Sequence, residues 1–149
     1  MAINERIRFF RNLRGMTLRH LGMQIGYPDK NADVRIAQYE RGSRKPRADT
    51  VHALAEVLDV SADALNIPNI DSYTGVLHTL FVLEDRYGLY IDEVDGEVCL
   101  KVDPCINEKA TALQEVLLIW KEQAKKLRSD EISKEEYDQW RYHYSADNA

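Results

Sequence analysis

The stretch from Thr17 to Pro46, TLRHLGMQIGYPDKNADVRIAQYERGSRKP, constrains the fold of this chain more than any other part of it. Leu21 and Ile25 have the spacing of neighbours on the inner face of a helix, and Gly26 is the kind of residue that ends one. A second apolar series follows the turn and stops at Gly42. The pattern therefore predicts two short helices packed around a turn.

The flanking residues extend this pair into a small all-α domain over residues 1–66. Thr17 is suited to cap a helix from Leu18 to Ile25, and Asn31 to cap the next helix, which runs to Arg41. Ser61 is suited to cap a short helix at 62–65. Two further helices complete the prediction: one before Gly15 that carries Ile7, Phe10 and Leu13, and one after Pro46 that carries Val51, Leu54, Ala55 and Leu58.

Charge is distributed unevenly along the chain. Residues 1–47 hold eleven Lys and Arg against four acids, whereas residues 67–149 hold nine against seventeen, and the whole chain has a net charge of −5. A basic segment in an acidic protein produces a local field that attracts polyanions. We therefore expect any nucleic-acid contact to come from the first third of the chain.

An ordered set of residues in this domain resembles the phage-repressor (Cro/Xre-like) helix-turn-helix family. The resemblance covers residues 4–66 and implies a five-helix, lambda-repressor-like fold that binds double-stranded DNA. The matching pieces are Arg6-Ile7-Arg8, Leu13, Gly15-Met16-Thr17, Leu21, Gly26, Ile36, Tyr39-Glu40-Arg41-Gly42, Pro46, Leu54-Ala55-Glu56-Val57-Leu58 and Val60-Ser61-Ala62-Asp63-Ala64-Leu65.

The turn departs from the family pattern. Twelve residues separate Gly26 from Tyr39, roughly four more than is usual in the family. The extra residues fall within 27–31 and lengthen either the turn or the front of the recognition helix. We therefore count the recognition helix backward from Tyr39.

In that register, the resemblance implies a face of the recognition helix that reads bases. Arg35 can form two parallel hydrogen bonds with guanine, Gln38 can do the same with adenine, and Val34 can pack on a thymine methyl group. Lys30 and Asn31 lie at the front of the same helix. The alternative is that these five residues form the solvated face of an amphipathic helix.

A second group is expected to hold the DNA backbone. Thr17 can offer its hydroxyl and nearby amides to a phosphate. Ser43, Arg44, Lys45 and Arg47 follow the recognition helix and would position the protein without reading sequence. The family also implies a structural pair between Arg11 and Glu40, although the two groups can instead be unpaired surface charges.

Residues 71–149, after a linker at 67–70, predict a small α+β module with the order α-β-β-α-α. Ser72 and Asn107 are suited to cap two helices that end near Gly88 and Arg128. Between them, Asp95-Gly96 is a strong hairpin turn, and it pairs Ile91 with Leu100 and Leu89 with Val102. Residues 133–136, Ser-Lys-Glu-Glu, form a capping box that opens the last helix. The fold class is thus mainly α with one hairpin, and we recognise no family in this module.

The long helix of this module carries an unusually broad apolar stripe formed by Leu117, Leu118, Ile119 and Trp120. Dimerisation is one interpretation, because operators are commonly read by twofold dimers. Interior packing explains the stripe equally well, and a protein partner for residues 71–149 is a third possibility.

Other functional classes have little support in the sequence. Neither a signal peptide nor an apolar run long enough for a membrane span is evident. Cys99 and Cys105 are too few for a disulfide framework and lack a recurrent metal-ligand spacing. We expect a cytoplasmic protein without enzymatic activity, metal or cofactor. The leading hypothesis is a homodimeric repressor that binds a palindromic DNA operator; the alternative is an antitoxin or inhibitor of a mobile element.

Overall fold

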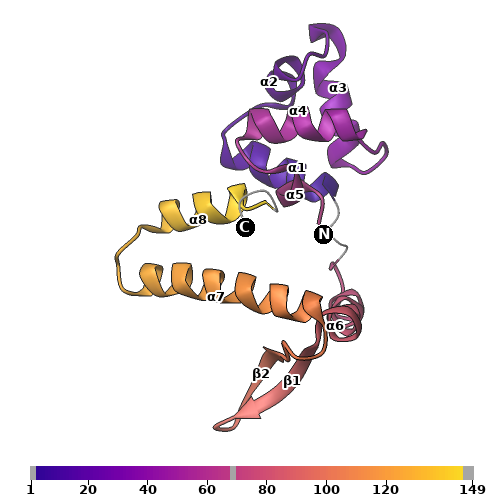
Figure 1. Cartoon of the computed structure of the whole chain (residues 1–149). Coiled ribbons are helices and arrows are strands. Elements are labelled where there is room, and N and C mark those ends of the chain that lie inside the picture. The colour runs from indigo at the N-terminus through magenta and orange to yellow at the C-terminus, as the bar shows by residue number, and fades with distance from the viewer. Residues whose placement is uncertain (1–2, 68–69, 146–149) are drawn as a thin grey trace. The chain divides into compact units, whose positions relative to one another are not determined.

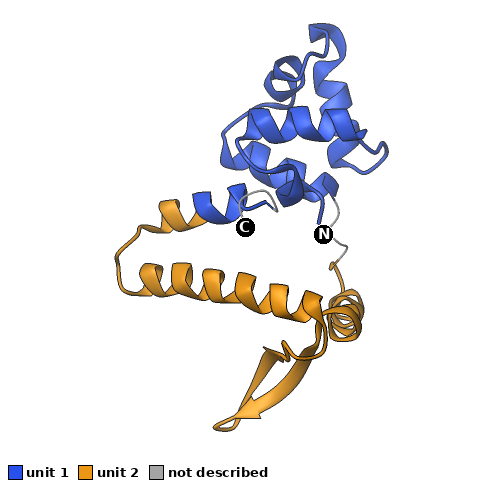
Figure 2. Cartoon of the chain, in the orientation of Figure 1, with its two compact units in different colours: residues 1–69, 139–149 blue, residues 70–138 orange. Residues whose placement is uncertain are grey.

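The computed structural model describes residues 3–67 and 70–145 of the 149-residue chain. The chain divides into two compact units (Figures 1 and 2). Unit 1 comprises residues 1–69 together with 139–149, and unit 2 comprises residues 70–138. We expected the second module to extend from 71 to 149, but its last part belongs to unit 1.

Unit 1 contains the five helices predicted from the sequence. They are α1 (Ile3–Leu13), α2 (Leu18–Gln24), α3 (Asp29–Glu40), α4 (Ala48–Leu58) and α5 (Ala62–Leu65). Their apolar faces meet in one core, in which the largest fully buried side chains are Phe10, Ile7, Leu21, Ile36, Leu54, Leu58 and Leu65. Burial of such side chains contributes roughly 1.5–3 kcal/mol each.

The start of α3 differs from the prediction. Asn31 was expected to cap this helix, but α3 begins at Asp29, directly after Pro28, and Asn31 lies within its first turn. An acidic side chain is favoured in the first turn of a helix, because the amide groups there are unpaired. The additional residues therefore lengthen the front of the helix, and the turn after α2 remains short.

Residues 139–145, here called the C-terminal segment, pack on unit 1. The Ser61 amide donates to the Tyr142 carbonyl oxygen at 2.9 Å, and the Ser61 hydroxyl donates to the Tyr144 carbonyl oxygen at 3.0 Å. The Tyr142 ring meets the buried Phe10 ring edge-on, with centroids 5.0 Å apart. The last residues of the chain that the structure describes therefore extend the core of the first five helices.

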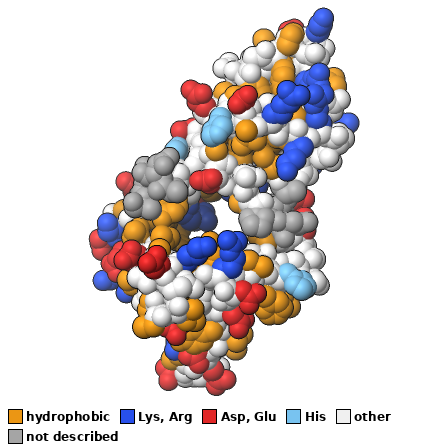
Figure 3. Space-filling view, turned by 45° about the vertical axis from the view of Figure 1, so that its right-hand side comes forward, with side chains coloured by type: hydrophobic (Ala, Val, Ile, Leu, Met, Phe, Trp, Pro, Cys, Tyr) orange, Lys and Arg blue, Asp and Glu red, His pale blue; other side chains and the backbone are white. Residues whose placement is uncertain are grey.

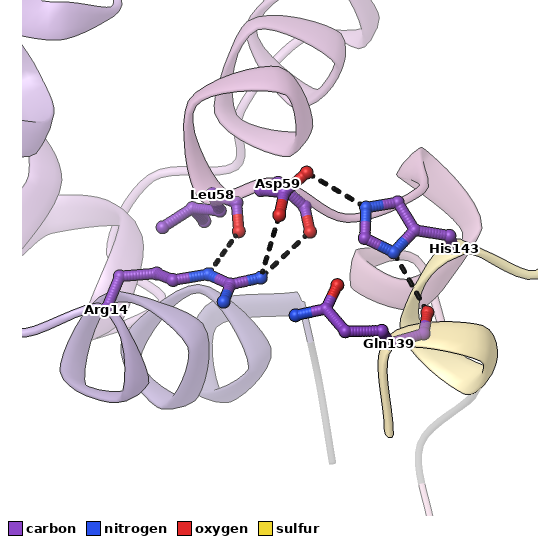
Figure 4. Close-up of polar contacts among 5 residues, drawn as sticks. All are labelled: Arg14, Leu58, Asp59, Gln139 and His143. Carbon is purple, nitrogen blue, oxygen red and sulfur yellow. Dashed lines mark hydrogen bonds and ion pairs between the residues drawn. The ribbon is translucent and has the colours of Figure 1, made fainter. Parts of the chain in front are cut away.

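A hydrogen bond joins the C-terminal segment to the end of α4 (Figure 4). His143 Nε2 lies 2.9 Å from Asp59 Oδ1, and His143 Nδ1 lies 2.9 Å from the Gln139 carbonyl oxygen. Both ring nitrogens thus face acceptors, and the hydrogen bond to Asp59 raises the pKa of His143. Arg14 approaches the same loop and donates to the Leu58 carbonyl oxygen at 2.9 Å.

Unit 2 contains α6 (Tyr73–Tyr87), β1 (Leu89–Val94), β2 (Glu97–Val102) and α7 (Glu108–Arg128); α8 (Lys134–His143) begins in unit 2 and ends in unit 1. The predicted hairpin register is confirmed, with Ile91 opposite Leu100 and Leu89 opposite Val102. The predicted caps also form: the Ser72 and Asn107 side chains accept from the Gly75 and Ala110 amides. The capping box of Ser133 and Glu136 is reciprocal.

Unit 2 buries little apolar surface. Among the described residues, the only buried hydrophobic side chains of this unit are Leu89 and Ala110. Large apolar side chains on both helices and on the hairpin remain at least 40% exposed; they include Leu77, Phe81, Ile91, Val98, Leu100, Leu118, Ile119 and Trp120. This unit therefore lacks the closed core of unit 1. None of the described helices has the length and hydropathy required to cross a membrane.

Candidate nucleic-acid interface

The α2–α3 pair is held together at very short range. Gly22 of α2 is buried against α3, and a Cβ atom at this position would lie 2.4 Å from the Ala32 carbonyl oxygen. The hydroxyl groups of Tyr27 and Tyr39 are 2.7 Å apart across the same junction. A glycine at position 22 is therefore what permits the close approach of the two helices.

An exposed ion pair that we did not predict lies at the lengthened front of α3. The Arg19 guanidinium of α2 donates two hydrogen bonds to the Asp29 carboxylate, and this contact lowers the pKa of Asp29. No local pattern marks these two residues as partners, because they are joined only by the way α2 and α3 pack. The pair ties the first turn of α3 to α2.

The side chains of α3 divide into an inner and an outer face. Ala32, Ile36 and Tyr39 are buried and recur at intervals of four and three residues, as expected for one face of a helix. Lys30 is exposed on the other side, and Val34 is 51% exposed. The outer face is therefore available to a groove of DNA.

The three other residues expected to read bases are half-buried at the flank of α3. They are Asn31, Arg35 and Gln38, spaced at four and three residues along one side of the helix. The side-chain oxygens of Asn31 and Gln38 are shielded from solvent and accept no hydrogen bond from the described residues. An unpaired buried acceptor costs about 1–3 kcal/mol, so a donor that reaches these amides would be favoured.

Four of the basic side chains counted in residues 1–47 are engaged inside unit 1. Each hydrogen-bonds to a carbonyl or carboxylate group, and none is therefore a free charge. The pairs are Arg6 with the Ala64 carbonyl, Arg11 with Glu40, Arg14 with the Leu58 carbonyl and Asp59, and Arg19 with Asp29.

Seven other cations of residues 1–47 form no ion pair with any described residue: Arg8 is exposed on α1, and the remaining six fall on α3 and the loop behind it. Those six are Lys30, Arg35, Arg41, Arg44, Lys45 and Arg47. Figure 3 shows Lys and Arg side chains gathered on one side of the upper part of the molecule in that view. A concentration of uncompensated positive charge suits a phosphate backbone.

Arg11 and Glu40 are brought together as a nearly buried ion pair. Arg11 Nε lies 2.5 Å from Glu40 Oε1, and their side chains are only 13% and 8% exposed. The hydrogen bond raises the pKa of Arg11. Since Arg11 also donates to the Met16 carbonyl oxygen at 2.8 Å, this guanidinium links α1, the turn before α2 and the end of α3.

The loop after α3 is folded onto the end of that helix. The Ser43 hydroxyl donates to the Gln38 carbonyl oxygen at 3.1 Å, and the Arg44 amide donates to the same oxygen at 3.3 Å. Thr17 is exposed at the start of α2, where its hydroxyl oxygen accepts from the His20 amide at 3.0 Å. The Thr17 proton therefore remains available to an external acceptor.

Comparison with known proteins places this unit in a family. The helix-turn-helix family matches residues 7–65. The crystal structure of transcriptional regulator BswR is 31% identical over 52% of this chain and 73% of that chain, with a TM-score of 0.44. The P22 c2 repressor protein, solved with a synthetic operator, is 30% identical over 44% of this chain and 94% of that chain, with a TM-score of 0.40.

The chain belongs to the Cro/Xre-like helix-turn-helix family. This is a family of DNA-binding transcriptional regulators. Comparison with curated proteins found no match. Because the family match ends at residue 65, membership accounts for the five helices of unit 1, and unit 2 lies outside it.

Proposed function

We propose that this helix-turn-helix protein is a sequence-specific transcriptional regulator, most simply a homodimeric repressor that binds a palindromic operator. The observation that carries the proposal is the distribution of unpaired positive charge. Of the eleven Lys and Arg side chains in residues 1–47, four hydrogen-bond within unit 1, and six of the seven others lie between Lys30 and Arg47; the seventh is Arg8 on α1. That distribution supports α3 as the helix that enters the major groove.

In this proposal, α3 reads bases with its outer face and its flank. Val34 packs on a thymine methyl group, and Arg35 donates to the O6 and N7 atoms of guanine. Asn31 and Gln38 turn their unpaired amides outward to adenine or cytosine edges, while Lys30 adds a contact at the front. Arg35→Ala should weaken operator binding by about 1–3 kcal/mol and relax the preference at one base pair. Equal weakening on every duplex would contradict base reading by Arg35.

The backbone contacts come from both sides of α3. Thr17 lies before it, at the start of α2, and Ser43, Arg44, Lys45 and Arg47 follow it. Lys45→Ala should lower the slope of log K against log salt by about 1, because one fewer counterion is released. Lys109→Ala is the matched control: Lys109 is an exposed cation of unit 2, and its loss should leave the slope unchanged.

Selection of bound duplexes from a random pool tests DNA recognition as a whole. A sequence-specific dimer should enrich two inverted half-sites whose centres are separated by about one helical turn or a multiple of it. Enrichment of no sequence would refute specific binding, and a single unrepeated site would refute the twofold arrangement.

Unit 2 supports the homodimer because it leaves apolar surface without cover. Leu117 is half-buried, whereas Leu118, Ile119 and Trp120 on the same helix are 41–50% exposed. Several large exposed apolar side chains on one helix favour an interface. Sedimentation of the full chain should give twice the monomer mass in the absence of DNA, and a monomer at micromolar concentration would contradict the dimer.

A second candidate function uses the same surface differently. The protein would then be an antitoxin or inhibitor whose unit 2 binds another protein and whose unit 1 regulates its own gene. The acidic composition of residues 67–149, with seventeen acids against nine bases, favours a basic partner for this role. Co-expression with the product of the adjacent gene distinguishes the two candidates, since only the second predicts a stable heterocomplex.

A further inference from the structure

The hairpin of unit 2 has an unpaired strand edge. Within residues 3–67 and 70–145, the sheet consists of β1 and β2, and no described strand lies beside the outer edge of β2. Two side chains of β2 are strongly exposed, Val98 at 73% and Leu100 at 52%. A two-stranded hairpin is only marginally stable by itself, and an exposed apolar edge is a template for pairing with another strand.

We propose that β2 pairs antiparallel with β2 of a second copy, about a twofold axis that passes through Cys99. This inference rests on the homodimer proposed above and names the contact at its centre. The result is a continuous four-stranded sheet in which each copy supplies one hairpin. Such an interface is isologous, since each residue meets its partner twice.

Symmetry restricts the possible registers to a few. When a twofold axis relates two antiparallel strands, residues equally distant from the central residue face each other, and facing side chains lie on one side of the sheet. With Cys99 at the centre, Glu97 faces Lys101 of the other copy. In the same register, Val98 faces Leu100 of the other copy on the opposite side of the sheet.

This register satisfies both sides of the sheet at once. Each Glu97 carboxylate gains a facing ammonium group, and each exposed Val98 gains an apolar neighbour. Lys101 already pairs with Asp92 of its own hairpin, with Nζ and Oδ2 2.5 Å apart. In the dimer, Lys101 would therefore lie between two carboxylates, one from each copy.

The neighbouring registers of β2 match less well. An axis through Leu100 would place Glu97 opposite Asp103 of the other copy, so that two acids face each other. An axis through Val98 would place Cys99 opposite Glu97 and lose the pairing with Lys101.

The edge of β1 offers no comparable arrangement. An axis through Asp92 would bring two identical carboxylates together, and one through Ile91 would place Leu89 opposite Glu93. Like charges that face each other across strands are destabilising, so charge favours the β2 edge.

Oxidation of the full-length protein tests the axis. Facing residues of an antiparallel pair have Cα atoms about 4.5–5.5 Å apart, within the range that a disulfide spans. Copper–phenanthroline should therefore oxidise the two Cys99 thiols to a disulfide between the copies. The thiols release two protons, and copper(II) accepts the two electrons. The Cys105→Ala variant should still form the cross-link, and Cys99→Ala, which keeps the exposed Cys105, should not.

Charge exchange tests the register. In Glu97→Lys, both facing pairs become repulsive, and Lys101→Glu has the same effect; each variant should dimerise about 30-fold more weakly than the original chain. An equimolar mixture of the two variants restores complementary pairs at both positions. The mixture should therefore regain dimer at a concentration where neither variant forms it alone.

This recovery also shows that the variant chains are folded, because the same molecules associate once mixed. Three results would each overturn the β2 pairing: a dimer that forms despite both substitutions, no recovery of dimer in the mixture, or no Cys99 cross-link. None of them would contradict the proposed DNA binding or the homodimer itself. A monomeric original chain would overturn the homodimer as well.

Discussion

The close approach of α2 and α3 at Gly22 provides a test of how α3 is positioned. We consider Gly22→Ala, which adds one methyl group to α2. That methyl carbon would lie 2.4, 2.7 and 2.9 Å from the carbonyl oxygen, carbonyl carbon and Cα of Ala32. All three obstructing atoms are backbone atoms of α3, so rotation of a side chain cannot relieve the clash.

The magnitude follows from two opposing effects. Ordinary contact to a Cβ begins near 3.4 Å, so α2 and α3 must separate by roughly 1 Å. Overpacking of this kind costs about 1–3 kcal/mol, occasionally more, whereas replacing glycine by alanine within a helix gains about 1 kcal/mol. Because the clashing atoms are all backbone atoms, we take the upper end of the overpacking cost and expect a net loss of about 2 kcal/mol, which lowers the melting temperature by roughly 8–16 °C in a domain of this size.

Thermal unfolding and operator binding measure the two consequences. Although Gly22 is buried away from DNA, its substitution should also weaken operator binding by at least about tenfold, because a displaced α3 loses one or more base contacts. Gln24→Ala is the matched control, since this exposed residue lies on the same helix and its change should stay within about 0.5 kcal/mol. A Gly22→Ala protein that is as stable as the original and binds equally well would refute the close-approach reasoning.

Two further substitutions test the contacts that hold unit 1 together. Glu40→Gln leaves the Arg11 guanidinium nearly buried without a counter-charge and should lower the free energy of unfolding, measured with denaturant, by about 2–4 kcal/mol. The double variant Arg11→Met/Glu40→Leu removes both charges and should lose less stability. An equal or greater loss in the double variant would contradict the cost assigned to the unpaired charge. His143→Gln should reduce the pH dependence of unfolding: a raised pKa means that the Asp59 contact stabilises fully below pH ~6.5 and is lost as pH rises through the higher folded-state value. A stability difference from the original chain that grows between pH 6 and pH 8 would contradict this sign.

Local signals in the sequence were sufficient for much of the fold. The hairpin was predictable because Asp95-Gly96 favours a two-residue turn, which then fixes the register of both strands. The helix starts after Thr17, Ser72 and Asn107 were predictable because each cap depends on an amide only three residues away. These features require no knowledge of distant parts of the chain.

The C-terminal segment was assigned to the wrong unit because its partners are remote in sequence. Ser61 and Tyr144 are 83 residues apart, and neither side chain carries a pattern that names the other. A helix boundary can be read from nearby residues, whereas the choice between two cores depends on tertiary contacts.

In the candidate interface, too, tertiary contacts supply what local patterns do not. They change how the positive charge of residues 1–47 is interpreted. Counting Lys and Arg in residues 1–47 marks the region as basic, but it gives Arg11 and Arg19 the same weight as Lys45. The structure separates them: the first two neutralise Glu40 and Asp29 inside unit 1, and Lys45 does not pair with a described residue. The nearly buried Arg11 pair also holds the end of α3, and the exposed Arg19 pair contacts its front. Arginines that pair within unit 1 therefore help to position α3, the helix that we propose contacts DNA.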